Sequence, residues 1–150
     1  MKKVIITLSL IIIIAGLVIK LIPSENKRLA NDIKLLKKAV EKEDKLATLL
    51  YLDSAYQDKN GLDYENLTAT IDDFFKDFDA VKISMNNIKI RIDSITIAKT
   101  IFATCSLGLK VFAKYGTDKV IVFGSVIHPT PVRAYFKKNT NHYKLYSAEY

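Results

Sequence analysis

The sequence contains few of the residues from which disulfides, metal sites and tight turns are built. Its 150 residues include one cysteine, two histidines, three prolines, five glycines and no tryptophan. The single cysteine excludes an internal disulfide, and it excludes a zinc site made from several thiolates. The few glycines form no nucleotide-binding pattern. We therefore expect neither a cofactor nor a bound metal ion.

The groups that acid–base catalysis normally uses are also scarce. His128 and His142 lie next to predicted turns, so we expect both in exposed loops. Asp53 and Tyr56 could face the domain interior, but a capping or surface role is commoner for such residues. Cys105 falls in the apolar phase of a predicted strand and should be a buried, unreactive thiol. No paired acid and base stands out, which favours a protein that is not an enzyme.

Positive charge exceeds negative charge, but it forms no nucleic-acid-binding pattern. There are 23 lysines and arginines against 16 aspartates and glutamates, a formal net charge of +7. Clustered basic residues bind phosphate backbones by releasing counterions. Here the lysines are scattered along the chain, and no arginine-rich run or recognition motif occurs. We therefore predict no nucleic-acid partner.

The first 23 residues have the composition of a membrane segment. After Lys2 and Lys3, residues 4–22 are almost entirely aliphatic. A helix of that length spans ~28 Å at ~1.5 Å per residue, close to the ~30 Å hydrocarbon core of a bilayer. No small-x-small cleavage site follows the apolar run, and no cysteine is available there for lipoprotein processing. Residues 1–23 are therefore predicted to be a retained signal anchor, a single transmembrane helix, rather than a cleaved signal peptide.

The charges around this segment predict its orientation. Lys2 and Lys3 favour a cytoplasmic N-terminus, although Lys20, Lys27 and Arg28 reduce the asymmetry. We expect one domain, formed by the remaining chain from residue 24 to residue 150, on the outer side of the bacterial cytoplasmic membrane. The predicted location is therefore the cell envelope.

A long amphipathic helix is predicted directly after the membrane segment. Apolar residues recur at steps of three and four from Leu29 to Leu50, and charged residues occupy the other face. Ser24 is placed to cap the start of this helix. A bend is expected near Glu43.

A second helix is predicted over residues 64–78. Gly61 favours a turn before it, and Asp63 is placed to cap its first turn. Its apolar side chains fall on one side of the helix: Leu67, Ile71, Phe74, Phe75 and Phe78.

From residue 80 onward the apolar period changes from about 3.6 to 2, which predicts β-strands. Asn86 and Asn87 shift the phase and so predict a bulge. The expected strands cover residues 81–92, 95–114, 119–127, 132–138 and 143–150. Two helices followed by antiparallel strands predict an α+β fold, in which the helices pack on one face of a curved sheet.

Several local stretches, in this order of elements, resemble the nuclear transport factor two-like superfamily, whose members have a cone-shaped, cystatin-like α+β fold. The matching stretches are Tyr56–Leu62, Tyr64–Leu67, Asp73–Phe75, Val81–Ser84 and Tyr143–Tyr146. The resemblance implies a conical pocket between the helices and the sheet, and frequent dimerisation through the sheet. It implies no single activity, because members include isomerases, dehydratases, secretion-system subunits and binding modules.

Two sets of residues are candidates for function. If the cone holds a small molecule, we expect it to be lined by Tyr51, Tyr56, Phe75, Ile101, Phe123 and Leu145. If the open sheet face is an interface, we expect its aromatic side chains to carry the contact: Phe102, Phe112, Tyr135 and Tyr146.

The leading hypothesis from the sequence is a membrane-tethered binding or assembly module outside the cytoplasm. It would form a homodimer or bind an envelope protein through its sheet face. The alternative is a small-molecule carrier, or an isomerase-like or dehydratase-like enzyme, that uses the cone pocket. A deep pocket with two converging ionisable groups would favour the enzyme, and a filled cone would favour the module.

Overall fold

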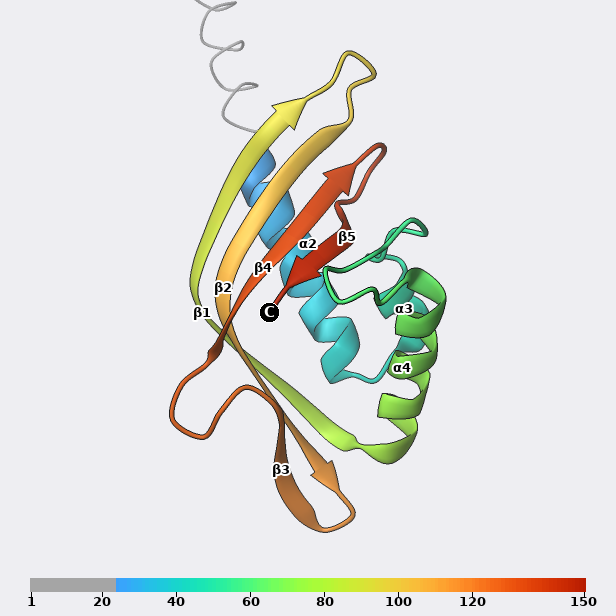
Figure 1. Cartoon of the computed structure of the whole chain (residues 1–150), viewed down its shortest axis with the longest axis vertical. Coiled ribbons are helices and arrows are strands. Elements are labelled where there is room, and N and C mark those ends of the chain that lie inside the picture. The colour runs from blue at the N-terminus through green and yellow to red at the C-terminus, as the bar shows by residue number, and fades with distance from the viewer. Residues whose placement is uncertain (1–23) are drawn as a thin grey trace, which may run out of the picture.

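The computed structural model describes residues 24–150, which form one α+β domain (Figure 1). Its elements in chain order are α2 (Glu25–Glu41), α3 (Lys45–Leu49), α4 (Tyr64–Asp77), β1 (Asp79–Ile95), β2 (Ile101–Tyr115), β3 (Asp118–Phe123), β4 (Thr130–Lys138) and β5 (Lys144–Glu149). The predicted fold class is confirmed. The predicted signal anchor, residues 1–23, lies outside the described residues.

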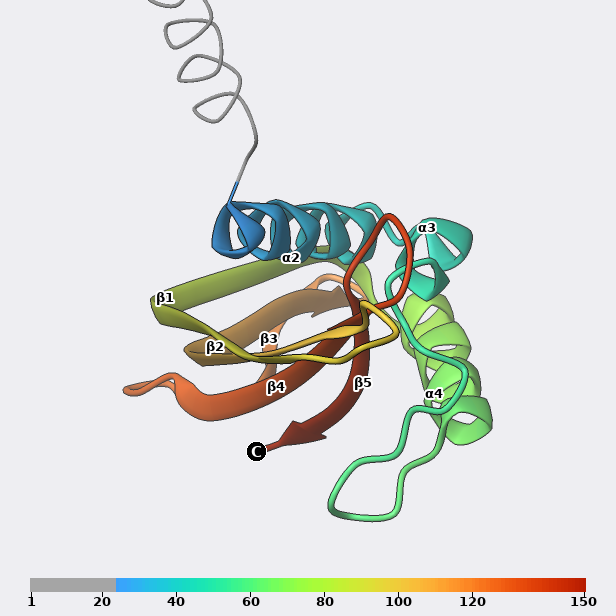
Figure 2. The same cartoon turned by 90° about the horizontal axis from the view of Figure 1, so that it is seen from above.

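The sheet is antiparallel and strongly curved, and the helices cover only its concave side (Figure 2). The strand order is β1-β2-β4-β5, and β3 pairs with the distal part of β2. Residues of β2 alternate between the two faces, so that Ala103 and Cys105 point to the helices and are buried. The core cluster lies between α2 and the middle of the sheet: Leu29, Ile33, Ile101, Ala103, Cys105, Ala134, Phe136 and Tyr143.

The helices begin where the capping residues predict. The Ser24 side chain accepts a hydrogen bond from the Lys27 backbone, and Asp63 caps α4 through the Asn66 backbone. The prediction of one long helix as far as Leu50 is wrong, however. The chain turns at Glu43, whose φ is 57°, and Asp44 then caps the separate helix α3. Apolar spacing continues across this turn because both helices face the same core, so the spacing alone does not reveal the break.

The strands differ from the prediction mainly at the β1–β2 hairpin. The bulge is confirmed, since the register shifts between Asn86 and Lys89 and Asn87 has a φ of 51°. The second strand begins at Ile101 rather than at residue 95, because residues 96–100 form the hairpin loop. The apolar alternation continues through Ile95 and Ile97, but both side chains are exposed.

Four carboxylates fix α2 on the sheet. Near its start, Glu25 accepts hydrogen bonds from Lys138 and from the Tyr143 hydroxyl. About two turns further on, buried Asp32 accepts the Tyr143 backbone N–H at 2.9 Å. At the other end, Glu41 and Glu43 accept the backbone N–H groups of two residues on the outer edge of β1, Ile83 at 2.9 Å and Val81 at 3.3 Å. These bonds also occupy two backbone N–H groups of the edge strand β1, which would otherwise be free to pair with a strand of another molecule.

Glu25 makes the stability of this arrangement depend on pH. Burial alone would raise the pKa of Glu25, but the hydrogen bonds from Lys138 and Tyr143 outweigh it and lower this pKa from its ordinary value of 4.5. The unfolded chain therefore binds this proton more readily than the folded chain does. The stabilisation by Glu25 is complete above the ordinary pKa and is lost as the pH falls through the lowered one.

We predict that Asp32→Ala lowers the free energy of unfolding by about 1–3 kcal/mol, because it leaves the buried Tyr143 N–H without its acceptor. Urea unfolding followed by circular dichroism measures this. Asn31→Ala is the matched control, since Asn31 is the exposed neighbour on the same helix. Equal stabilities of the two variants would contradict the role of Asp32.

A second prediction concerns Glu25→Gln. The variant should be less stable than the wild type at pH 7, and the difference should shrink as the pH is lowered below 4.5, where protonation removes the same charge from the wild type. Unfolding curves measured at pH 7 and pH 3 give this difference directly. A difference that stays constant over this range would contradict the assignment.

Candidate functional site

A cavity of about 420 Å³ lies between the concave face of the sheet and the helices. Its wall is almost wholly apolar. The helices contribute Leu36, Val40, Leu67, Ile71, Phe74 and Phe75, and the strands contribute Met85, Leu107, Leu109, Phe123, Leu145 and Ala148. An apolar wall of this kind suits an apolar molecule.

α4 is held near its ends and, from α3, by the Lys45–Asp72 ion pair at 3.0 Å, and none of these contacts fills the space between α4 and the sheet. At its C-terminal end, Phe74 stacks on Phe78 at a centroid distance of 5.1 Å, and Phe78 stacks on Tyr115 at 5.7 Å. At its start, Asp63 bridges to Gln57. No residue of α4 is fully buried. Its apolar face therefore borders the cavity instead of filling it.

Two of the polar groups in the cavity wall, the Tyr56 hydroxyl and the Cys105 thiol, are neutral at physiological pH. Tyr56 is only 5% exposed, and burial, assisted by the nearby Asp58 carboxylate, raises the pKa of its hydroxyl to about 12. Burial likewise raises the pKa of the Cys105 thiol to about 11. Lys37 lies at the margin, 3.9 Å from Glu41. These groups do not form the ionised acid–base pair that proton-transfer catalysis needs.

Four of the six residues proposed for the pocket border the cavity: Tyr56, Phe75, Phe123 and Leu145. Tyr51 lies apart from them, edge-on to the ring of His142 at 5.7 Å. Ile101 belongs to the closed core beside Leu29. Cys105, Leu107 and Leu109 also border the cavity, and they were not among the predicted pocket residues. Their shared apolar phase on one strand is the feature of the sequence that indicates this position.

The remaining catalytic candidates lie away from the cavity. His142 is exposed as expected, and its Nδ1 lies 3.1 Å from Asp32. Asp53 accepts the Ala55 N–H in a local turn, but it is buried and forms an ion pair with Lys137 at 2.9 Å. Of the two roles expected for Asp53, the capping role is confirmed by the Ala55 bond, and the surface position is wrong, because the sequence does not show its partner on β4.

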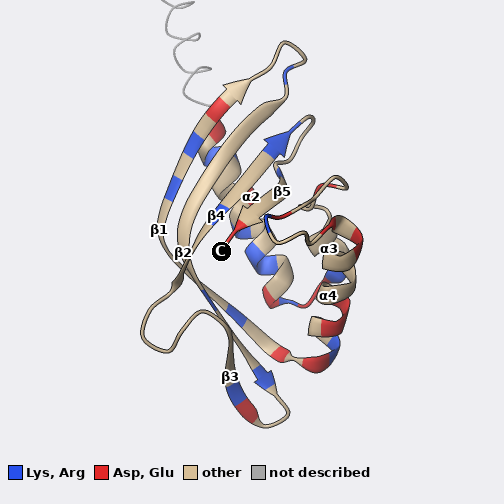
Figure 3. Cartoon of the chain, in the orientation of Figure 1, with Lys and Arg blue, Asp and Glu red and all other residues tan. Residues whose placement is uncertain are grey.

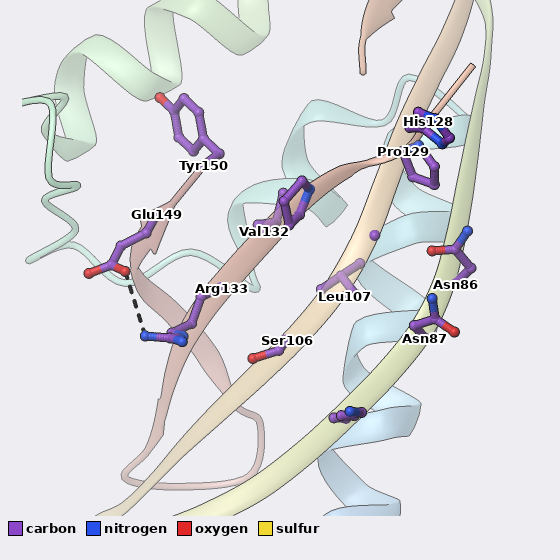
Figure 4. A pocket seen from close by; sticks show the side chains of 13 residues that line it. Asn86, Asn87, Ser106, Leu107, His128, Pro129, Val132, Arg133, Glu149 and Tyr150 are labelled. Atoms are coloured by element: carbon purple, nitrogen blue, oxygen red, sulfur yellow. Dashed lines mark ion pairs between the residues drawn. The ribbon is translucent and has the colours of Figure 1, made fainter. Parts of the chain in front are cut away.

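A second concavity, about 700 Å³, is a broad groove on the open face of the sheet (Figure 4). Strand register places Lys89, Ser106, Arg133 and Glu149 side by side across it. Gly108 gives the groove its depth, because a Cβ there would lie 2.2 Å from the Asn86 side-chain oxygen. The groove is open and has both polar and apolar lining residues, whereas the wall of the cavity on the other face is almost wholly apolar.

Three of the four residues proposed for the interface meet on this open face. The Tyr146 ring lies 5.9 Å from Phe102 and 6.3 Å from Tyr135. The Lys137 ammonium lies 5.9 Å from the centre of the Tyr146 ring. Phe112 lies farther along β2, where it pairs with Ile121 of β3. The open face therefore carries one half-buried aromatic cluster and not a continuous stripe.

Across residues 24–150, no group of three His, Cys, Asp or Glu side chains is placed to hold a metal ion. None of the helices in that range has the length and apolar character to cross a bilayer.

Comparison with known proteins identifies the fold. No protein-family model and no curated protein matches the sequence. Among solved structures, the helical cell shape determining protein Pgp2 of Campylobacter jejuni (K307A mutant) matches 79% of this chain with a TM-score of 0.62 and 14% identity. Bd1075 of Bdellovibrio bacteriovorus matches 82% with a TM-score of 0.59 and 10% identity. The matched part is only 38% of the first protein and 40% of the second.

A protein of similar length shows the same arrangement. A proposed dehydratase of the NTF2-like family from Streptomyces avermitilis matches 85% of this chain and 96% of its own, with a TM-score of 0.60 and 11% identity. These likenesses agree with the resemblance seen in the sequence, and they rest on the arrangement of helices and strands. The described domain has the NTF2-like, cystatin-like α+β fold.

Proposed function

We propose that this protein binds an apolar small molecule in the cavity between α4 and the sheet. The observation that carries the proposal is the cavity itself, which is apolar and within the roughly 300–1,000 Å³ range of ligand pockets. An empty apolar cavity of this size is unfavourable, because its wall atoms are left without apolar packing partners. An apolar occupant restores those contacts.

Binding without chemistry fits the wall better than catalysis does. The Streptomyces protein of the same fold is a proposed dehydratase, and dehydration moves protons between positioned acids and bases. In this chain the cavity offers the neutral Tyr56 hydroxyl and the neutral Cys105 thiol. A carrier or sensor of an apolar ligand requires neither group to ionise.

The proposal includes a location at the bacterial cytoplasmic membrane, with the domain outside the cytoplasm. Residues 4–22 supply an apolar run of membrane-spanning length, and α2 begins at Glu25, shortly after it. A place in the cell envelope is compatible with the matched part of Pgp2, a cell-shape-determining protein. Apolar ligands are also most concentrated at membranes, so the tether would place the cavity near their source.

The open sheet face supports a second candidate function, a homodimer or an envelope-protein interface. The aromatic cluster of Phe102, Tyr135 and Tyr146 supports it, because rigid rings bury a large area at low entropic cost. Both functions are compatible in one protein, since the cavity and the cluster lie on opposite faces of the sheet.

We predict that Ala148→Trp weakens binding of the uncharged fluorophore N-phenyl-1-naphthylamine by at least about tenfold, or about 1.4 kcal/mol. The indole would occupy the cavity, which Ala148 borders. Ser147→Trp is the matched control, because Ser147 pairs with Tyr135 on the opposite face. Fluorescence titration of the domain, residues 24–150, measures both. Unchanged binding by Ala148→Trp, or equal losses in both variants, would contradict the cavity as the binding site.

For the sheet face, we predict that Phe102→Asp, a change within the aromatic cluster, lowers the oligomeric state or abolishes co-purification of envelope proteins with the full chain in mild detergent. Buried carboxylates without partners are strongly unfavourable in an interface. Size-exclusion chromatography with light scattering and affinity purification measure the two effects. A variant that keeps the wild-type oligomer and partners would remove the interface from consideration.

A further inference from the structure

The loop of the β1–β2 hairpin presents apolar side chains to solvent. Ile97 is fully exposed and Ile95 is 64% exposed. The loop closes on itself, because Thr96 N donates to the Thr100 carbonyl at 2.9 Å and Lys99 N donates to the Thr96 carbonyl at 2.9 Å. Some backbone N–H and C=O groups of the loop are therefore hydrogen-bonded within the loop. This lowers the free energy needed to transfer the loop from water into an apolar environment. Two isoleucines two positions apart therefore form a small exposed apolar surface at the tip of the hairpin.

The loop lies at the end of the domain where α2 begins. Strand register pairs Ile95 with Ile101, and Ile101 with Lys138. Lys138 in turn bonds Glu25, the first residue of α2. Figure 1 shows the hairpin and the start of α2 at the same end of the molecule. The predicted membrane segment ends only two residues before Glu25, so this end of the domain is the one closest to the bilayer in the proposed location.

The charges at this end suit a lipid headgroup layer. Lys27, Arg28 and Lys99 are exposed there. The nearby acids are engaged within the protein, since Glu25 bonds Lys138 and Asp93 bonds Arg91 and Thr104. Many of the acidic residues instead lie on α4 and around its ends, away from the hairpin (Figure 3). Lysine and arginine near a membrane surface are attracted to anionic lipids, and their long stems reach the interface.

We propose that the tip of the β1–β2 hairpin, which comprises Ile95 at the end of β1 and the loop of residues 96–100, is a second membrane contact that inserts Ile95 and Ile97 into the interfacial layer of the bilayer. This inference rests on the membrane location in the proposed function. Two contacts on one bilayer, the N-terminal segment and this loop, would fix the orientation of the domain, whereas one tether would leave it free to rotate.

The absence of tryptophan makes the test direct, because one introduced tryptophan is the only one in the chain. The full chain carrying Ile97→Trp is reconstituted into vesicles of phosphatidylcholine and phosphatidylglycerol, with and without bromine on the acyl chains. We expect blue-shifted emission and loss of emission in the brominated vesicles. Val126→Trp is the matched control, because Val126 is 81% exposed and contacts Lys110 at the other end of β2. Its emission should stay red-shifted and unquenched.

The outcomes separate the two hypotheses. If the protein floats with the vesicles but the emission of Ile97→Trp is as red-shifted and unquenched as that of Val126→Trp, the proposed loop contact is wrong. The proposed N-terminal membrane anchor is then still supported. If neither variant floats with the vesicles, the tether is wrong, and the loop contact is overturned with it. Replacing phosphatidylglycerol with phosphatidylcholine tests the charge argument, since quenching of Ile97→Trp should decrease without the anionic lipid.

Discussion

The carboxylates that hold α2 on the sheet are the interaction on which the rest of the structure depends. Glu25 and Asp32 bind groups around Tyr143 at one end, and Glu41 and Glu43 bind the backbone edge of β1 at the other. A carboxylate that accepts a backbone N–H away from water forms one of the stronger hydrogen bonds in proteins. Loss of any of these acceptors leaves a polar group without its partner. The position of α2, and of the core beneath it, is therefore specified by polar bonds as well as by apolar packing.

The second long helix is held differently, and this difference creates the candidate site. α4 has a capped start and an aromatic contact near its end, but its middle meets the sheet only across the cavity. Apolar contacts are non-directional, so this wall can adjust to an occupant more easily than α2 can. One firmly held helix and one adjustable helix over the same sheet are what a binding protein for an apolar molecule requires.

Local signals in the sequence predicted the parts of the fold that local chemistry controls. Ser24 and Asp63 cap helices, and the two asparagines of β1 form a bulge, because each of these effects depends on neighbouring residues alone. The apolar alternation misplaced the β1–β2 hairpin for a physical reason. Ile95 and Ile97 continue the pattern of a buried strand, yet Ile95 ends β1, Ile97 lies in the hairpin loop, and both side chains are exposed. The alternation of apolar residues therefore does not by itself distinguish a buried strand from an exposed hairpin tip.

Long-range pairing limited what could be predicted of the site. Tyr56, Phe75, Phe123 and Leu145 border the cavity, but Tyr51 and Ile101 do not, because the depth of the cone depends on where α2 closes it. The ion pair of Asp53 with Lys137 was equally hidden, since 84 positions separate the two residues in the chain.

The apolar, accessible cavity between α4 and the sheet is the feature on which the proposed function depends. A crystal structure of the domain, residues 24–150, under xenon pressure tests it most directly, because xenon enters dry apolar cavities and is visible by its scattering. We expect xenon to bind among Phe74, Leu107 and Ala148. Crystals in which α4 lies flat on the sheet, with side chains filling this space and no xenon bound, would contradict it.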